Sequence, residues 1–436
     1  MSNFNTIFQS IVRIIESLLK RVLCKKTGTQ YKFFLDMVFG ILKSSSLILT
    51  DVGFSLNEKS SLKKVEERLC RNLQGEISIS TKHAFISYCL SLMNQNKMVF
   101  IVDDSDIVKP YGKKFEGLMI VRDGSKNGVL EKGLQVTAVV GLSGNFKHPI
   151  PIMTIAHSVH DKNYTSNNNV TNKALRSIFQ HLTPWNAIFV FDRGYDDQKL
   201  MRLIHSENQY FLIRIRKNRA IFIKNKRIDI FKIAESRKGR VVIETTYKGK
   251  PETLKASHVV GKINGFKSLV TIVFSYGYKF EEPIILITNK MVHSKDDLIS
   301  LTLNYFSRWK IEEIFRFKKV EFGMENFRVK SQAAINNLLF LLDMSVAILA
   351  QIIETQKENQ IFRFLIDVSK QIRTDVSINY YQVLSGLKAL FASNKMGVQN
   401  YKQIERWEYE KMSLFNSLEL NEKKRVRSNR KIRINN

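Results

Sequence analysis

Cysteine is scarce in this sequence of 436 residues, and its placement excludes two common kinds of site. The chain has three cysteines, Cys24, Cys70 and Cys89, an odd number with no C-x2-C spacing. A disulfide framework needs paired cysteines, and a structural zinc site needs closely spaced thiol or imidazole ligands. The eight histidines do not cluster with the cysteines. The sequence therefore favours a reducing compartment and argues against a disulfide-linked or zinc-bound fold.

Long apolar runs are also missing. The most apolar stretch, residues 338–353, is interrupted by Asp343 and is too short to span a bilayer, so a buried helix is favoured. The first 21 residues have the apolar spacing of a helix, but they lack a small-residue cleavage site and carry Arg13 and Glu16. We therefore expect no membrane span and no signal peptide, and we predict a cytoplasmic, nucleoid-associated protein.

Acidic residues are few relative to basic ones. The chain has 69 Lys and Arg against 40 Asp and Glu, which gives a formal net charge of +29 at pH 7. Such an excess repels itself in the free protein, and a polyanionic partner relieves the repulsion and releases counterions. Nucleic acid is therefore the favoured partner, and an anionic membrane surface is the alternative.

The apolar patterns divide the chain into three parts. Residues 1–95 have apolar side chains three and four positions apart with basic residues between them, which predicts either a helical DNA-binding domain or a solvated helical bundle. Residues 96–330 mix strand-like runs with helical stretches, which predicts an α/β fold with a buried sheet flanked by helices. Residues from about 205 to 292 are mostly short strands and are predicted to form a β-rich insertion. Residues 331–436 are predicted to be helical and to end in a basic tail over residues 423–433.

Two aspartates follow buried strands of the predicted sheet. Asp103 comes after the apolar run MVFIV, and Asp192 comes after AIFVF. An acid at the carboxyl end of a buried strand points into the crevice where sites form. Each aspartate alone is weak support for catalysis, because strand ends also carry aspartate as a turn residue.

A helix is expected over residues 305–319, which contain neither glycine nor proline. At about 3.6 residues per turn, one narrow stripe of this helix holds four polar side chains: Tyr305, Arg308, Glu312 and Lys319. Glu313 lies off the stripe. A carboxylate beside a guanidinium, an ammonium and a phenol is suited to hold a metal next to a phosphodiester. The alternative is a surface helix with an ion pair between Arg308 and Glu312.

Two aspartates at strand ends and one helical glutamate make a plausible carboxylate cage for two Mg²⁺ ions. Magnesium prefers a few carboxylates, with water and substrate phosphate completing its coordination. Two such ions can activate an attacking oxygen and stabilise a leaving one, so no covalent protein intermediate is required.

These residues resemble the motifs of the DDE transposases of bacterial insertion sequences, in the insertion-sequence-four-like branch marked by Y-x2-R-x3-E-x6-K. The signature stands complete in YFSRWKIEEIFRFKK. The first aspartate motif of the family matches IVDDS and places the catalytic acid at Asp103, with Asp104 as the neighbouring alternative. The second motif matches VFDRG at Asp192. The resemblance covers roughly residues 95–330.

The resemblance implies an RNase H-like catalytic core with a β-strand insertion, a helical N-terminal domain that contacts the element ends, and a helical C-terminal region. It implies that Asp103, Asp192 and Glu312 bind two Mg²⁺ or Mn²⁺ ions, while Tyr305, Arg308 and Lys319 position DNA phosphate. The implied partners are the inverted repeats of a transposon end, target DNA and a second copy of the chain in a synaptic complex. The implied reaction is cleavage at the element ends, followed by attack of the freed 3′-OH on target DNA.

The sequence departs from the family at one position. Relatives commonly carry a tryptophan in the strand before the glutamate helix, which stacks on a flipped base when a DNA hairpin forms. Ile284 stands there in this chain. The hairpin step is therefore not predicted from this position; the alternative is that another aromatic side chain serves. Farther upstream, Arg214, Arg216 and Lys217 either line the DNA path or cover an exposed strand face. A nuclease without strand transfer and an inactive DNA-binding relative are the alternatives for function.

Overall fold

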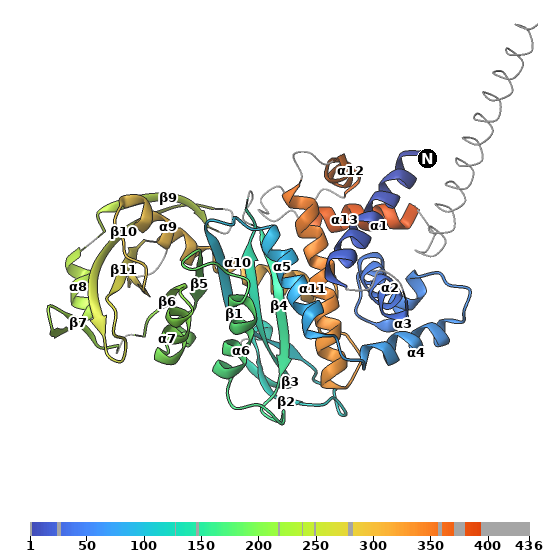
Figure 1. The fold of residues 1–436 in the computed structure, drawn as a ribbon, viewed down its shortest axis with the longest axis horizontal. Helices are drawn as coiled ribbons and strands as arrows, with labels where there is room; N and C mark the ends of the chain where they lie inside the picture. Colours follow the sequence, from blue (N-terminus) through green and yellow to red (C-terminus); the bar gives the residue numbers. More distant parts are fainter. Residues whose placement is uncertain are drawn as a thin grey trace, which may run out of the picture.

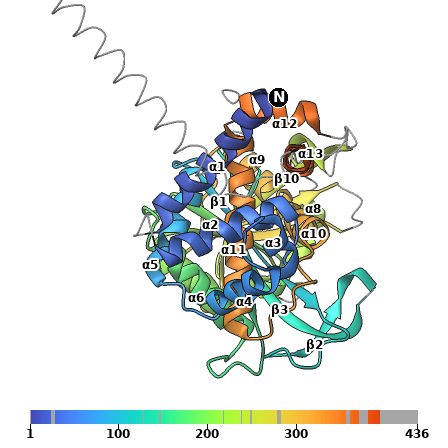
Figure 2. The same cartoon turned by 90° about the vertical axis from the view of Figure 1, so that its right-hand side faces the viewer.

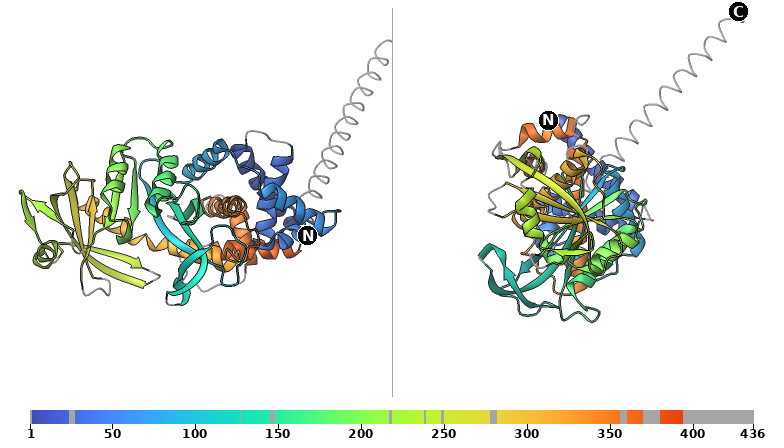
Figure 3. Two further views of the ribbon diagram at one scale, coloured as in Figure 1. Left: turned by 90° about the horizontal axis from the view of Figure 1, so that it is seen from below. Right: turned by 90° about the vertical axis from the view of Figure 1, so that its left-hand side faces the viewer.

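A computed structural model describes ten stretches of the chain: residues 2–23, 28–126, 128–144, 148–216, 219–237, 239–247, 250–277, 282–355, 360–369 and 380–393. It has a mixed α/β fold with a large sheet at its centre. Additional strands lie at one end of the long axis and helices from both ends of the chain at the other (Figure 1). The same order is seen from below (Figure 3). The basic tail and Lys217 lie outside the described residues.

The centre of the sheet is β1 (Met98–Val108). It pairs antiparallel with β3 (Val129–Leu142) on one side and parallel with β5 (Ala187–Phe191) on the other. Beyond β3 lie β4 (Pro149–His157) and β2 (Met119–Asp123), both antiparallel to it. Every residue of β5 and the first five of β1 are buried, as expected for strands covered on both faces.

The sheet continues past β5 into the part predicted as an insertion. β6 (Tyr210–Arg214) lies inside the predicted range of about 205–292, yet it pairs in parallel with β5 and so continues the central strands. The next strands in order are antiparallel: β12 (Ile284–Thr288), β11 (Val270–Tyr276) and β10 (Lys250–Ile263). β10 also pairs with β9 (Val241–Tyr247) and, at its other end, with β7 (Ile221–Ile223), which pairs with β8 (Lys226–Ile228). The added strands therefore extend the central sheet rather than forming a separate one.

Three helices connect strands of this sheet. They are α6 (Asn167–Phe179) between β4 and β5, α7 (Gln198–Ser206) between β5 and β6, and α8 (Ile230–Arg237) between β8 and β9. α6 is capped by Ser166, whose hydroxyl accepts from the Asn169 amide, and α7 is capped by the Asp197 carboxylate. α6 packs against β3 and α7 against β6.

The N-terminal part is helical. Its helices are α1 (Ser2–Val22), α2 (Thr29–Ser44), α3 (Leu49–Ser55), α4 (Leu62–Leu73) and α5 (Ile79–Ser91). α1 buries one stripe of apolar side chains, while α2 is buried over most of its length. Figure 2 shows these helices gathered around α11, with α13 beside them. They therefore share one core with the C-terminal helices.

The C-terminal helices begin with α9 (Lys295–Phe306) and α10 (Trp309–Glu321). α11 (Gln332–Glu354), α12 (Gln360–Val368) and α13 (Tyr380–Ser393) follow. Among the described residues α11 is the one helix long and apolar enough to cross a membrane, and 83% of its most apolar window is buried inside the protein. The α2–α3 pair also passes that test as a unit, but it is bent by 96°. α11 packs on β4 and α2, so it is the core helix of this region.

Candidate active site

Asp103 lies in the middle strand of the sheet, where the apolar part of β1 ends. The backbone amide of Asp104 donates to Asp103 Oδ1 at 3.0 Å. Arg308 Nη1 donates to Asp103 Oδ2 at 2.8 Å across a separation of 205 residues in sequence. The carboxyl group thus has one oxygen fixed by its own strand and the other by a helix-terminal arginine.

Asp104, the neighbouring candidate, has different partners. Thr137 Oγ1 donates to Asp104 Oδ1 at 2.7 Å, and the same hydroxyl lies 2.9 Å from His157 Nε2. Successive side chains of a strand point to opposite faces of its sheet. Asp103 is therefore the acid that contacts a residue of the helix signature, while Asp104 belongs to a polar cluster with β3 and β4.

Asp192 directly follows β5, the parallel neighbour of β1. Val102 pairs with Phe191, so Asp103 and Asp192 are the next residues of two adjacent strands. Tyr305 Oη donates to Asp192 Oδ1 at 3.3 Å. The strand register and the tyrosine thus bring the second acid beside the first.

The helix expected over residues 305–319 is interrupted. α9 ends at Phe306 and α10 begins at Trp309, so the prediction of one continuous helix was wrong. The amides of Arg308, Lys310 and Ile311 each donate to the carbonyl three residues earlier, at 3.0 to 3.1 Å. Bonds of this type tighten a helix into a 3₁₀-like turn, which ends the regular α-helical pattern.

Glu312 remains on the same side as Arg308 despite this turn. Arg308 Nη2 donates to Glu312 Oε1 at 2.7 Å, whereas Glu313 pairs with Arg316 at 3.2 Å. One guanidinium therefore bridges Asp103 of β1 and Glu312 of α10. The structure brings together five of the six predicted site residues. Arg308 contacts Asp103 and Glu312, and Tyr305 contacts Asp192 on the neighbouring strand.

Lys319, the sixth predicted residue, lies farther along α10. Its ammonium donates to the backbone carbonyl of Asp106 at 2.6 Å and lies 3.1 Å from Glu325 Oε1. The amide of Val108 donates to the same glutamate oxygen at 3.1 Å. Lys319 therefore ties the end of α10 to β1, a role that its place in the stripe did not indicate.

Arg214 is a cation of the site that the sequence left undecided. It ends β6, the parallel strand next to β5, and it forms a hydrogen bond with the Tyr305 side chain. The rule that located Asp103 and Asp192 at strand ends applies to it equally. Arg216 lies two residues farther on, where its amide donates to Asp196 Oδ2 at 2.9 Å, so it belongs to a separate turn.

Burial controls the ionisation of these groups. It raises the pKa of Asp103 to about 7; the Arg308 charge and the Asp104 amide lower this pKa, and the Asp192 charge raises it. Burial alone would lower the pKa of Arg308, but three surrounding carboxylates, those of Asp103, Asp192 and Glu312, raise it well above its ordinary value. Burial and the Asp192 charge raise the pKa of Tyr305 to about 12, so its hydroxyl stays protonated.

The chemistry of these donors suits magnesium. Carboxylate oxygens are its preferred protein ligands, and two adjacent, partly buried carboxylates repel each other, a repulsion that a bound cation relieves. Within the described ranges, however, no three His, Cys, Asp or Glu side chains are close enough to hold one ion. Asp103 and Asp192 are the adjacent pair, and Glu312 is joined to them through Arg308.

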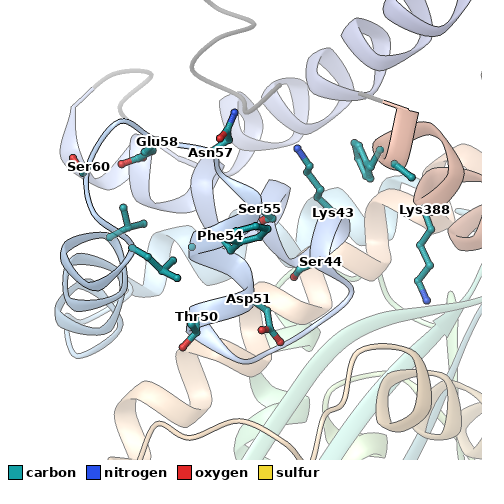
Figure 4. Close-up of a pocket in the computed structure, with 15 residues that line it drawn as sticks. Lys43, Ser44, Thr50, Asp51, Phe54, Ser55, Asn57, Glu58, Ser60 and Lys388 are labelled. Carbon is teal, nitrogen blue, oxygen red and sulfur yellow. The ribbon is translucent and has the colours of Figure 1, made fainter. Parts of the chain in front are cut away.

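Ile284, at the position where tryptophan was expected from the resemblance, begins β12 and is buried against β11. Its side chain is therefore part of the sheet interior. A pocket of about 1040 Å³ lies elsewhere, between α2, α3, α4 and α13. Figure 4 shows Lys43, Phe54 and Lys388 around it. None of the predicted site residues lines that pocket.

A comparison with protein families agrees with the motifs. A family model described as "Transposase DDE domain" matches residues 94–349. Comparison with curated proteins finds no match. Among solved structures, the chain is similar to a piggyBac transposase synaptic complex with hairpin DNA, with 10% identity, 93% of this chain and 82% of that chain covered, and a TM-score of 0.46. It also matches a Drosophila P element transposase strand transfer complex, with 10% identity, coverage of 89% and 86%, and a TM-score of 0.19. Both structural likenesses are too weak to support a conclusion about this chain.

Proposed function

This chain belongs to the DDE transposase family, and we propose that it cleaves phosphodiester bonds at the ends of a mobile element and joins the freed 3′-OH ends to target DNA. One observation carries the proposal. Three acids from distant segments, Asp103, Asp192 and Glu312, surround a single guanidinium, that of Arg308. The fold does not require three acids around one arginine, because a single carboxylate is enough to form an ion pair with a partly buried guanidinium.

We further propose that the chain belongs to the insertion-sequence-four-like branch and that its catalytic core is RNase H-like. The order of the central strands, β4-β3-β1-β5-β6, with β5 and β6 parallel to β1, supports an RNase H-like core. The proposed division is a DNA-binding domain over residues 1–95, a catalytic domain over 96–330 and a helical region over 331–436.

Each residue of the site has a proposed task. Asp103, Asp192 and Glu312 would hold two Mg²⁺ or Mn²⁺ ions, which when bound supply activation of the attacking oxygen and stabilisation of the leaving oxygen. Tyr305 orients the Asp192 carboxylate, because its hydroxyl donates to it. Arg308 lies among the carboxylates with part of its side chain exposed, so it can donate to a non-bridging phosphate oxygen.

Lys319 keeps a third N–H beside the two groups that it already contacts, and we propose that this N–H faces the phosphate. Arg214 adds a further positive charge next to Tyr305. The proposed partners are double-stranded DNA of the element ends and target, and a second copy of the chain in a synaptic complex. The net charge of +29 supports a polyanionic partner, and we propose a cytoplasmic, nucleoid-associated location.

The test uses labelled inverted-repeat DNA, a target plasmid and Mg²⁺. We expect cleaved ends and joined products with the unchanged protein. Asp103→Asn, Asp192→Asn and Glu312→Gln should each lower the cleavage rate by at least about 100-fold, because each removes a ligand worth several kcal/mol in the transition state.

Glu313→Gln is the matched control, because Glu313 neighbours Glu312 but pairs with Arg316, so its cleavage rate should be unchanged. Nicked DNA without joined products would instead identify a nuclease. Unchanged cleavage by Asp192→Asn would show that the catalytic assignment is wrong.

A further inference from the structure

A second pocket, of about 490 Å³, lies among the added strands of the sheet. It is lined by the end of α8, the start of β9, the middle of β10 and the residues that lead into α9. None of the catalytic carboxylates or signature residues lines it. The pocket is therefore a feature that the proposed chemistry does not use.

Basic side chains dominate the lining of this pocket. Arg237, Arg240 and Lys295 are exposed at its rim, and His258 and His293 lie between them. No carboxylate is among the lining residues. Burial lowers the pKa of the His258 imidazole, and the charge of nearby Arg237 lowers this pKa further. Arg237 thus disfavours a positive charge on His258, and an anion bound in the pocket would be attracted to the unbalanced positive charge of its lining.

A buried hydroxyl lies among these cations. Ser257 is 5% exposed and lines the pocket, and its Oγ has no hydrogen-bond partner among the described residues. A buried polar group without a partner is costly, so native structures satisfy nearly all of them. The helix end nearby does not satisfy it, because the first turn of α9 is closed by its own capping box of Ser294 and Asp297. Ser257 therefore brings a buried hydroxyl without a hydrogen-bond partner to the lining of this pocket.

We propose that this pocket binds a backbone phosphate of the DNA that the active site cleaves. Three cations, a buried hydroxyl and no carboxylate match a phosphodiester, which carries one negative charge and several acceptor oxygens. The inference rests on the proposed function, since the phosphate belongs to the same DNA.

The position of the pocket fits that assignment. A single helix, α9, begins beside the pocket with Lys295 and carries Tyr305 at the active site. At about 1.5 Å per residue, these two residues lie about 15 Å apart along the helix axis, the axial length of about four base pairs. The pocket therefore lies within the length of a short duplex bound at the active site, and α9 fixes the spacing between the two.

The experiment measures the affinity of the full chain for labelled inverted-repeat duplex as a function of salt concentration. Arg240→Gln and Arg237→Gln should each weaken binding about tenfold and reduce the slope of log K against log salt by about one. Ser257→Ala should weaken binding a few-fold and leave the slope unchanged, because a hydroxyl releases no counterion. Arg227→Gln is the matched control: Arg227 is an exposed arginine of β8 outside the pocket, and we expect no change.

Melting temperatures of all four variants show whether a loss of affinity reflects a loss of folding. Unchanged affinity and slope in both pocket arginine variants would overturn the proposal. A second outcome would also overturn it. In that outcome inorganic phosphate raises the melting temperature of the unchanged protein but not that of Arg240→Gln, while both proteins bind DNA equally. The pocket would then bind a free anion rather than DNA phosphate.

The outcome is separable from that of the proposed function. At saturating DNA the pocket variants should cleave at the rate of the unchanged protein, because they lack no catalytic carboxylate. If the unchanged protein cleaves and joins ends while the pocket variants bind normally, this inference fails and the transposase proposal stands. If DNA binding depends on the pocket but the unchanged protein does not cleave, the transposase proposal fails and the pocket is a phosphate-binding site of DNA that this chain does not cut.

Discussion

Arg308 holds Asp103 at 2.8 Å, and the same guanidinium holds Glu312 at 2.7 Å. A strand residue and a helix residue that lie more than 200 positions apart in sequence are thus fixed relative to each other. The arginine is placed for this by the tight turn between α9 and α10, which ends one helix and begins the next at the edge of the sheet. The relative positions of Asp103 and Glu312 therefore depend on this turn, because the turn places the arginine that contacts both.

The raised pKa of Asp103 predicts a pH-dependent stability. The pKa is about 7 in the folded protein and about 4 in an unfolded chain. Below pH 4 the Asp103 carboxyl is neutral in both the folded and the unfolded state, so it does not change the free energy of unfolding. As the pH rises from 4 through 7, the unfolded chain ionises first, so the free energy of unfolding falls. Since the carboxyl keeps some contact with water, we expect this loss to be on the order of 2 kcal/mol.

Denaturant unfolding between pH 4.5 and 8.5 in a chelating buffer measures this effect. Asp103→Asn should lose the contribution, so its stability relative to the unchanged protein rises with pH. Asp296→Asn is the control, because Asp296 is exposed in the first turn of α9. Parallel stability curves for Asp103→Asn and the unchanged protein would contradict the prediction.

Lys319 and Glu325 allow a structural role to be separated from a DNA contact. The two side chains form an ion pair at 3.1 Å, and both hold β1 through backbone groups. If Lys319 also contacts phosphate, Lys319→Gln removes a charge that releases a counterion. We expect weaker DNA binding and a salt slope smaller by about one. Affinity measured over a range of salt concentrations tests this.

Glu325→Gln is the matched variant, because it breaks the same ion pair without removing a positive charge. It should lower stability by about 1 kcal/mol or less and leave the salt slope unchanged. Equal slopes for Lys319→Gln and the unchanged protein would restrict Lys319 to anchoring α10.

The sequence alone predicted which acids the structure places near one another, for a physical reason. Asp103 and Asp192 each follow a buried apolar run, and the two runs lie side by side in parallel strands. Only Asp192 lies at the end of its strand, because β1 continues past Asp103 to Val108 by pairing with β3. Helical spacing separated Glu312 from Glu313 because side chains four positions apart share a face. These are local rules, so a single sequence is sufficient to apply them. All four of these acids lie within residues 94–349, the range that the transposase family model matches.

Other features depend on contacts that local rules do not include. The break at Ser307 and Arg308 has no glycine or proline to mark it, so the spacing predicted one helix. Glu325, the partner of Lys319, lies after the end of α10 and therefore outside the helical stripe that holds Glu312 and Lys319. The continuation of the sheet through β6 into β12 requires the pairing of residues more than 70 positions apart. Periodicity identifies strands but not their neighbours.

Helix α10, which carries Glu312, is fastened to the core by a second, buried ion pair. Lys318 Nζ lies 2.5 Å from Asp343 Oδ1 and 2.9 Å from Thr154 Oγ1, and both charged side chains are almost fully buried. These contacts join α10 to α11 and β4. Lys318 is also the neighbour of Lys319 in the helix signature, so the pair fixes the rotation that directs Glu312 and Lys319 toward the site.

Asp343→Leu should therefore lower the free energy of unfolding by about 3 to 5 kcal/mol, because it leaves an unpaired buried ammonium. The double variant Lys318→Met with Asp343→Leu should recover most of that loss, since apolar side chains of similar volume replace both charges. Lys388→Gln is the control: it breaks the exposed pair of Lys388 with Glu321 and should cost about 1 kcal/mol or less. Denaturant unfolding of the three proteins measures these differences. A double variant as unstable as Asp343→Leu would show that the hydrogen bond to Thr154, rather than the pairing of charges, holds α10 in place.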